Sequence, residues 1–318
     1  MKFALTARRG PLYSRLSSSH YSKLSCAVGF IEGDARRLSF RRQQLTVNTD
    51  HAVTTHPPFV DIHCHIVPSI DDGSKSWDES LAMARMAAGD GTEIIIATPH
   101  QLGSFRHNTA KEIRHRVDQL NATLEQQSIP LKVMPGGDVR IEADMITQIQ
   151  ADNVLTLGDQ GKHVLLELPH EMYFPLEPVL ESLERIGMQG ILSHPERNQG
   201  LLKQPELIEQ LVDRGCYMQV TAGSLAGTFG PASQGLAEQM VERRQVHFIA
   251  TDAHGPRSRR PLMWRAFERV AEMTNWDFAE DICCHNPRLV AAGKHVEIPP
   301  QQRPRQTLAS WFGWRKAA

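Results

Sequence analysis

The amino-acid sequence predicts an α/β fold, in particular a distorted seven-stranded barrel of alternating strands and helices. Short apolar runs of strand length alternate with segments of helical periodicity, which is typical of parallel strands joined by right-handed crossovers. An acid, a histidine or an arginine follows nearly every apolar run. All strand ends of a β/α barrel converge on one face, whereas an open sheet spreads them along a line. The placement of these polar residues therefore favours the barrel over an open doubly wound sheet.

Seven apolar runs are the predicted strands, because each is short and dominated by aliphatic residues. They are residues 59–62, 94–98, 131–134, 164–168, 190–193, 217–220 and 246–251. Five segments between or after these runs are predicted helices. The first of them opens with Ser76 and Glu79, the spacing of a capping box, and another opens on a proline that suits a first helical turn. The five segments are residues 76–88, 111–127, 176–186, 205–214 and 231–244.

The composition divides the chain into three parts. Residues 1–56 contain nine Lys/Arg against three Asp/Glu, are rich in serine and lack a hydrophobic period, which predicts a disordered extension. A targeting peptide or an over-long assigned start would have the same composition. Residues 57–294 form the predicted barrel. Residues 295–318 are predicted to be a flexible tail, and Trp311, Phe312 and Trp314 indicate a weak membrane or partner contact there.

Bulk properties exclude several classes of protein. A net charge of −1 and a pI near 7.0 give no general attraction to nucleic acid or to anionic lipid. The five cysteines show no C-x-x-C spacing, which argues against a disulfide framework and a thiolate zinc site. No run reaches the length of a membrane span, and the first residues lack the apolar core of a secretory signal. The expected location is the cytoplasm.

Two pairs of residues have the spacing of metal ligands on a strand. His63 and His65 lie two residues apart, so both imidazoles point to the same face, which Asp61 shares. Asp252 and His254 repeat this spacing near the end of the last predicted strand. Cys64 points to the opposite face and is interpreted as a small buried residue. Mixed imidazole and carboxylate ligands suit manganese, iron or zinc better than calcium or magnesium.

Further residues of the metal-binding type lie at separate strand ends. A single strand-end histidine is more often a hydrogen-bonded structural residue than a ligand. Two pairs together with several more such residues at different strand ends instead indicate one shared metal site, and an acid at the end of a buried strand would be costly without a partner. The further residues are Asp71 or Asp72 on a loop, His100, Glu167 and His194.

Arginines accompany the predicted metal site. Arg197 follows His194 by three residues, and Arg259 and Arg260 follow His254 closely. Cationic side chains beside cationic metals would repel them unless an anion lay between. A phosphate satisfies both, because its oxygens accept hydrogen bonds from a guanidinium fork and bind metals. The sequence therefore indicates a phosphoester substrate rather than an amide or a sugar.

These motifs resemble the PHP (polymerase and histidinol phosphatase) superfamily, and more narrowly its bacterial protein-tyrosine phosphatase branch, which is associated with capsule and exopolysaccharide synthesis. The resemblance covers about residues 59–290. The H-x-H and D-x-H pieces are shared across the superfamily, whereas HPERN and QVTAGSL are specific to the branch. The motifs are His63-Cys-His65, Asp71-Asp72-Gly73, Ala97-Thr-Pro-His100, His194-Pro-Glu-Arg-Asn198, Gln219-Val-Thr-Ala-Gly-Ser-Leu225 and Asp252-Ala-His254.

The resemblance implies a (β/α)7 TIM-like barrel, the PHP fold, with two or three divalent metals of the Mn²⁺ type. Arg197 and Arg259 match phosphate-binding positions. Because Arg260 adjoins Arg259, the resemblance leaves open which of these two arginines reaches the phosphate. Asp138 stands where the family usually has Glu. The implied metal ligands are His63, His65, Asp72, His100, Asp138, Glu167, His194, Asp252 and His254.

The expected activity is metal-dependent hydrolysis of phosphotyrosine in proteins. A water held between metals would attack phosphorus, Arg197 and Arg259 would neutralise the transferring oxygens, and His254 or a metal-bound water would assist the leaving phenolate. The partner implied by the resemblance is the Tyr-rich tail of a bacterial tyrosine autokinase. Alternatives are a phosphatase for a small phosphomonoester such as histidinol phosphate, or a weakly active regulator that binds phosphotyrosine. A nuclease is disfavoured by the neutral charge and the absence of a basic, aromatic stripe.

Overall fold

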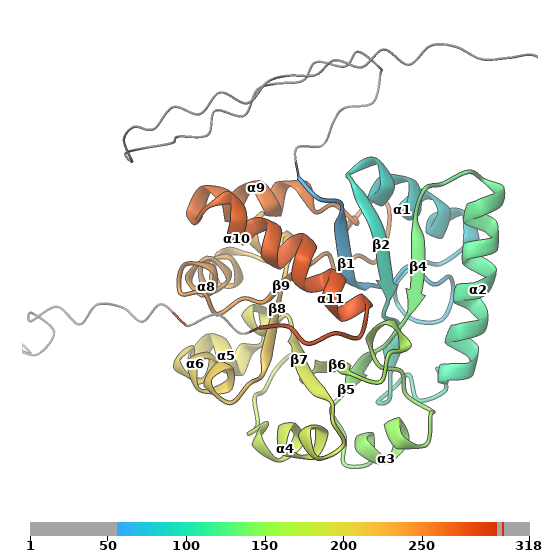
Figure 1. Ribbon diagram of the computed structural model, residues 1–318. Coiled ribbons are helices and arrows are strands. Elements are labelled where there is room, and N and C mark those ends of the chain that lie inside the picture. Colours follow the sequence, from blue (N-terminus) through green and yellow to red (C-terminus); the bar gives the residue numbers. More distant parts are fainter. Residues whose placement is uncertain (1–55, 298–300, 302–318) are drawn as a thin grey trace, which may run out of the picture. The chain divides into compact units, whose positions relative to one another are not determined.

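The computed structural model describes residues 56–297 and residue 301, and in this part of the chain nine strands form two parallel sheets (Figure 1). The first sheet has three strands in the order β1-β2-β4, and the second has six in the order β3-β5-β6-β7-β8-β9. Nearly all of the predicted N-terminal extension, and most of the predicted tail with its two tryptophans, lie outside the described residues. The chain therefore has a mixed α/β fold with parallel sheets.

Every predicted apolar run contains a strand. The seven strands are β1 (Phe59–Cys64), β2 (Thr92–Ala97), β4 (Lys132–Pro135), β6 (His163–Glu167), β7 (Gln189–Ser193), β8 (Tyr217–Thr221) and β9 (Phe248–Ala250). Two further short strands, β3 (His100–Gln101) and β5 (Asp138–Arg140), lie outside the predicted runs.

Two neighbouring chain segments pass from the first sheet into the second. Thr98 and Pro99 separate β2 from β3, and Gly136 and Gly137 separate β4 from β5. β2 pairs with β4, and beyond the interruption β3 pairs with β5. A Cβ atom at Gly136 would lie 2.7 Å from Cγ2 of Ile96, so the glycine lets these two segments approach closely where they change sheets.

The first and last strands of the described chain also meet. The backbone N–H of Asp252 donates to the carbonyl of His63 at 2.7 Å, and the N–H of His65 donates to the carbonyl of Ala253 at 2.9 Å. Cys64 and Ala253 form an isolated parallel bridge. β1 of the first sheet is thereby hydrogen-bonded to the segment that follows β9 of the second.

Helices flank the strands on the outside (Figure 1). The five predicted helices are present as α1 (Trp77–Gly89), α2 (Ala110–Gln126), α4 (Glu177–Arg185), α6 (Glu206–Asp213) and α8 (Pro231–Glu242). Ser76 is the predicted N-cap of α1, and its hydroxyl accepts from the N–H of Glu79 at 3.2 Å. The other helical segments are α3 (Met145–Gln150), η1 (Leu157–Asp159), η2 (Pro195–Arg197), α5 (Gln199–Lys203), α7 (Ala222–Leu225), α9 (Trp264–Met273), α10 (Trp276–Glu280), η3 (Asp281–His285) and α11 (Asn286–Ala291).

Buried side chains from both sheets pack together. One cluster contains Ile62 of β1, Leu165 of β6 and Phe248 of β9, all fully buried. Val296 belongs to the same cluster, and its carbonyl accepts from the hydroxyl of Tyr217 at 2.5 Å, so the chain is still packed at this residue. No helix in the described ranges combines the length and apolar character needed to cross a bilayer.

Candidate metal centre

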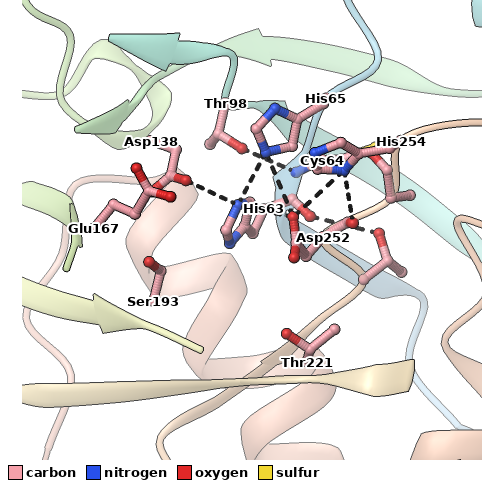
Figure 2. Close-up of polar contacts among 12 residues, drawn as sticks. His63, Cys64, His65, Thr98, Asp138, Glu167, Ser193, Thr221, Asp252 and His254 are labelled. Carbon is pink, nitrogen blue, oxygen red and sulfur yellow. Dashed lines mark hydrogen bonds and ion pairs between the residues drawn. The ribbon is translucent and has the colours of Figure 1, made fainter. Parts of the chain in front are cut away.

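Nine side chains predicted as metal ligands lie close together, and all of them belong to strands or to the loops that follow strands. Strands and following loops from both sheets contribute to the group, and Figure 2 shows several of the side chains pointing toward one another. The nine residues form four overlapping sets of three or four whose ligand atoms all lie within 4.8 Å of one another. These sets are His65, Asp72, His100 and His254; His63, His65 and Asp138; His63, His194 and Asp252; and His100, Asp138 and Glu167.

Short distances between ring nitrogens and carboxylates define the centre of this group. Nε2 of His63 lies 3.3 Å from Oδ1 of Asp252 and 3.6 Å from Oδ2 of Asp138. Nδ1 of His100 lies 3.3 Å from Oδ2 of Asp138 and 3.7 Å from Oε2 of Glu167. Because His63, His100 and Asp138 each belong to two sets, the arrangement has the geometry of several neighbouring metal positions with shared ligands.

Asp138 provides a test of whether metal ions fit here. Its side chain is fully buried, and neither carboxylate oxygen has a hydrogen-bond partner. Burying a carboxylate without hydrogen bonds is costly unless an ion compensates its charge. Nε2 of His63 also lies 3.2 Å from Nε2 of His65, so two ring nitrogens face each other. Both features fit a divalent cation held between these groups.

Two side chains that the sequence analysis did not single out as orienting groups hold the histidine rings in place. Oδ2 of Asp71 contacts Nδ1 of His65 at 2.7 Å, and Oε1 of Gln219 contacts Nδ1 of His63 at 2.8 Å. A proton on each Nδ1 leaves Nε2 free to bind a metal, which is the usual arrangement around ligating histidines. The sequence offers Asp71 and Asp72 as alternatives, and the structure places Asp72 in the ligand group and Asp71 behind His65.

The charges within the centre shift the pKa values of its members. Burial opposes the protonation of His65 and His100, but the neighbouring carboxylates outweigh it and raise the pKa of His65 to about 9 and that of His100 to about 11. Burial, together with the charge of Asp138, raises the pKa of Glu167 to about 7. Without metal, the centre thus stabilises extra positive charge, which is the electrostatic environment that a bound cation requires.

A cavity of about 210 Å³ opens onto this centre, and Arg197 and Arg259 form part of its wall. Both guanidinium groups contact Oδ2 of Asp252. Arg197 also lies over the ring of Phe229, 4.2 Å from its centroid, and Nε of Arg259 is buried without a hydrogen-bond partner. The two arginines are therefore held in place with donor groups beside the candidate metal ligands.

Two sequence interpretations change at this cavity. Arg260 is exposed and does not line it, so of the adjacent pair only Arg259 faces the site. His170, which has no special placement in the sequence pattern, does line the cavity. It lies on the loop that follows β6, and a strand-end pattern cannot predict the direction of such a loop.

The backbone is strained at three residues of the site. His194, Asp252 and Arg259 have φ angles of 34°, 48° and 48°, in the left-handed region that favours glycine. Such conformations cost on the order of 1–3 kcal/mol each and persist where the surrounding structure enforces them, commonly at functional sites. Here they direct an imidazole, a carboxylate and a guanidinium into one cavity.

Comparison with known proteins gives a consistent result. The family model described as "Capsular polysaccharide synthesis, CpsB/CapC" matches residues 59–292. Tyrosine-protein phosphatase YwqE of Bacillus subtilis (strain 168) is 38% identical over 256 residues, which is 80% of this chain and 100% of the relative. The putative tyrosine-protein phosphatase CapC of Staphylococcus aureus is 28% identical over 257 residues, 80% of this chain and 99% of the relative.

Solved structures show the same likeness. A chain from crystal structures of YwqE from Bacillus subtilis and CpsB from Streptococcus pneumoniae, described as unique metal-dependent tyrosine phosphatases, matches with a TM-score of 0.73 and 32% identity. The match covers 78% of this chain and 100% of that chain.

Proposed function

Because this chain belongs to the CpsB/CapC family of capsular polysaccharide synthesis proteins, we propose that it is a metal-dependent phosphatase that hydrolyses phosphotyrosine in proteins. Its relatives YwqE and CapC carry the name tyrosine-protein phosphatase, the latter as a putative one. The observation that carries the proposal is one cavity with two different recognition elements. A cluster of histidines and carboxylates forms one wall, and Arg197 and Arg259 form another. A phosphate ester is the ligand that bridges both.

The proposed metal ligands are the nine residues of the candidate centre, and the proposed ions are two or three Mn²⁺. Imidazole and carboxylate ligands suit manganese, and iron and zinc accept the same set. The preference for manganese rests on the family resemblance. Elemental analysis of the protein purified from its native host would identify the ion.

The reaction follows from the position of the side chains. Divalent metals bound at the centre would supply Lewis acidity and acidify a water molecule for attack on phosphorus. Arg197 and Arg259 bind the phosphoryl oxygens and neutralise the charge that grows on them during transfer. Asp252, which contacts both guanidinium groups, positions them relative to the centre.

His254 fits a ligand role better than the role of a proton donor. Its Nδ1 lies 3.0 Å from the carbonyl oxygen of Asp252, so Nδ1 carries a proton and donates to that oxygen. Burial lowers the pKa of His254, which favours the neutral ring. The lone pair of Nε2 is then available for a metal, and Nε2 lies 3.5 Å from Oδ1 of Asp72 within the ligand group.

We also propose that the two sheets together form the distorted seven-stranded barrel. Counting β2 with β3 and β4 with β5 as two interrupted strands leaves seven strands in all. The backbone bonds between His63 and Asp252 and between His65 and Ala253 support a junction between the first and last of them. The interruptions at Pro99 and at Gly136-Gly137 account for the distortion.

The proposed physiological substrate is the Tyr-rich tail of a bacterial tyrosine kinase that controls polysaccharide export. The family description in terms of capsular polysaccharide synthesis supports this assignment. Incubation of such an autophosphorylated kinase with the protein, followed by phosphotyrosine-specific detection, would test it directly.

Hydrolysis of a phosphotyrosine peptide and of histidinol phosphate, each with Mn²⁺ and after chelation, tests the proposed activity. We expect metal-dependent turnover that favours the peptide and is lost in His194→Ala. His115→Ala is the matched control, because His115 is exposed on α2. A preference for histidinol phosphate would instead indicate a small-molecule phosphatase, and bound metal without turnover would indicate a phosphotyrosine-binding regulator. Activity that survives both chelation and the mutation would contradict the metal mechanism.

A further inference from the structure

A second, larger cavity lies directly beside the candidate metal centre. It has a volume of about 410 Å³ and shares His100 and Glu167 with the cavity at the metal centre. Residues 100–105 form one side of it, and Arg140, Glu142 and Glu167 form the other. We call this cavity the Arg140 groove. Within the described part of the chain, Arg140 is the only arginine or lysine that lines it.

The cavity at the metal centre is too small to hold more than a small part of a polypeptide substrate. At about 210 Å³ it is smaller than the roughly 300–1,000 Å³ of common ligand pockets, so it holds little more than the phosphorylated side chain. The rest of a polypeptide substrate must then lie outside it. The Arg140 groove begins at His100 and Glu167, on the edge of the first cavity, and is therefore in reach of the residues that flank the phosphotyrosine.

The turn that forms one side of the groove is fixed in place. Leu102 is buried although its φ is 68°, a strained value for a residue with a side chain. The N–H of Phe105 donates to the carbonyl of Leu102 at 2.9 Å. The ring of Phe105 stacks on His100, with 5.2 Å between centroids and 26° between planes. The groove is thus preformed, and it presents the half-buried ring of Phe105 next to a candidate metal ligand.

Arg140 has donor groups to spare on the opposite side. Its side chain is 33% exposed, and its nearest carboxylate oxygen, Oε2 of Glu167, lies 3.7 Å away. Its hydrogen bond to the carbonyl of Leu168 is long, at 3.3 Å. Glu142, on the same side of the groove, forms its ion pair with Arg106 rather than with Arg140. If Glu167 binds a metal, as the proposed function requires, the charge of Arg140 is left for another anion.

We propose that the Arg140 groove binds the residue adjacent to phosphotyrosine in the substrate polypeptide, and that Arg140 selects an acidic side chain at that position. The inference rests on the proposed function and adds a determinant of sequence preference to it. The bound residue packs against the ring of Phe105, and its carboxylate accepts hydrogen bonds from the guanidinium of Arg140.

Three phosphotyrosine peptides test the inference. They differ only in the residues adjacent to the phosphotyrosine, which are Asp in the first peptide, Asn in the second and Lys in the third. For the wild type we expect kcat/KM to be about tenfold higher for Asp than for Asn, the size of one charge-assisted hydrogen bond. In Arg140→Gln this ratio falls to about one, through KM rather than kcat, and Arg140→Glu prefers Lys. Arg185→Gln, which changes an exposed arginine of α4, is the matched control and keeps the wild-type ratio.

The ratio between peptides is independent of enzyme concentration and of partial loss of metal. A wild type without preference for Asp, or an Arg140→Gln variant that keeps the preference, would overturn the inference while leaving the phosphatase in place. A wild type that hydrolyses none of the three peptides, although it holds metal, would overturn the proposed function itself.

Discussion

At the scale of single residues, side chains behind the candidate metal ligands hold those ligands in position. Asp71 contacts Nδ1 of His65 at 2.7 Å and also accepts from the backbone N–H of His100 at 3.0 Å. One carboxylate therefore orients a histidine ring and the backbone of a second candidate ligand. It lies behind the ligand group, so its effect on the metal is indirect.

We expect Asp71→Asn to lower metal affinity or activity by about 10- to 100-fold, because the amide is a weaker partner for the ring N–H of His65. Titration of the metal-free protein with Mn²⁺, followed by calorimetry, would measure the affinity. Asp144→Asn is the control, because Asp144 is bound to the exposed Arg106 away from the centre. An unchanged affinity in Asp71→Asn would show that the carboxylate is not needed to orient the ring.

A buried histidine outside the centre makes stability depend on pH. Nδ1 of His247 accepts from the N–H of Met218 at 3.0 Å, and its Nε2 is buried without a partner. Burial lowers the pKa of His247 from 6.5 to about 4. Between these values the unfolded chain binds a proton that the folded chain does not, so acidification favours unfolding.

The free energy of unfolding should fall as the pH decreases from 6.5 to about 4, by about 3 kcal/mol from His247 alone. His247→Asn keeps an acceptor for Met218 and removes the titrating ring. Urea unfolding of both proteins across this range should show a shallower pH dependence in the variant. His115→Asn, at an exposed position, should keep the slope of the wild type. Equal slopes for His247→Asn and wild type would contradict the assignment.

At the scale of elements, the interruptions between strands place two of the candidate ligands. Gly137 immediately precedes Asp138, and a Cβ atom there would lie 2.3 Å from Oε1 of Gln101. That oxygen accepts from the N–H of Leu155 at 2.8 Å, and Gln101 is fully buried, so it has little room to move.

Gly137→Ala should therefore destabilise the fold by about 1–3 kcal/mol, as overpacking does in a tight core, and lower the metal content. Gly235→Ala is the matched control, because Gly235 lies in α8 and a methyl group added there would meet nothing within 4 Å. That change should leave metal content unaltered and stabilise the helix by about 0.5–1 kcal/mol. Denaturant unfolding and elemental analysis of both variants would decide.

The limits of sequence-based prediction are clearest for the short elements. The seven predicted strands are predominantly apolar runs, and such runs identify strands that are largely buried on both faces. β3 and β5 have two and three residues, follow a proline or a glycine pair, and contain the polar His100, Asp138 and Arg140. They form only because neighbouring segments pair with them. Helix α9 lies outside the predicted segments as well, because its start is capped by the distant Asp90, whose carboxylate accepts from the N–H of Trp264, and not by a residue next to it in the sequence.

The same distinction applies to the site. Most of the candidate ligands could be predicted because polar residues at the ends of parallel strands meet, whereas Asp138 and the choice of Asp72 over Asp71 came from the family resemblance. The orienting role of Gln219 could not, because its contact with His63 joins residues 156 positions apart. Arg140 likewise has no sequence signal, since its importance comes from the groove that the turn at Leu102 creates.

At the scale of the whole molecule, the candidate metal centre draws its ligands from both sheets. His63 lies in β1 of the first sheet, and Asp138 and Glu167 lie in β5 and β6 of the second. A ligand that binds only the folded chain adds its binding free energy to stability, so metal should stabilise the fold as a unit.

Removal of the metals should lower the midpoint of thermal unfolding by on the order of 10 °C, and added Mn²⁺ should restore it in proportion to its concentration. Differential scanning calorimetry of the chelated and reconstituted protein would measure the shift. In His194→Ala the dependence on Mn²⁺ should be weaker. A chelated protein, metal-free by elemental analysis, that melts at the wild-type temperature would contradict the connection between the two sheets through metal.

The junction between β1 and the segment after β9 has a consequence for synthesis on the ribosome. His63 leaves the ribosome early. Its carbonyl accepts from the N–H of Asp252, and the adjacent contact between Asp61 and Thr251 joins residues 190 positions apart, so the partner segment is synthesised much later. The nascent chain therefore lacks part of the proposed metal centre through most of translation. A product truncated before this segment would carry several of the candidate ligands but no complete centre, so we expect phosphatase activity only in chains translated past His254.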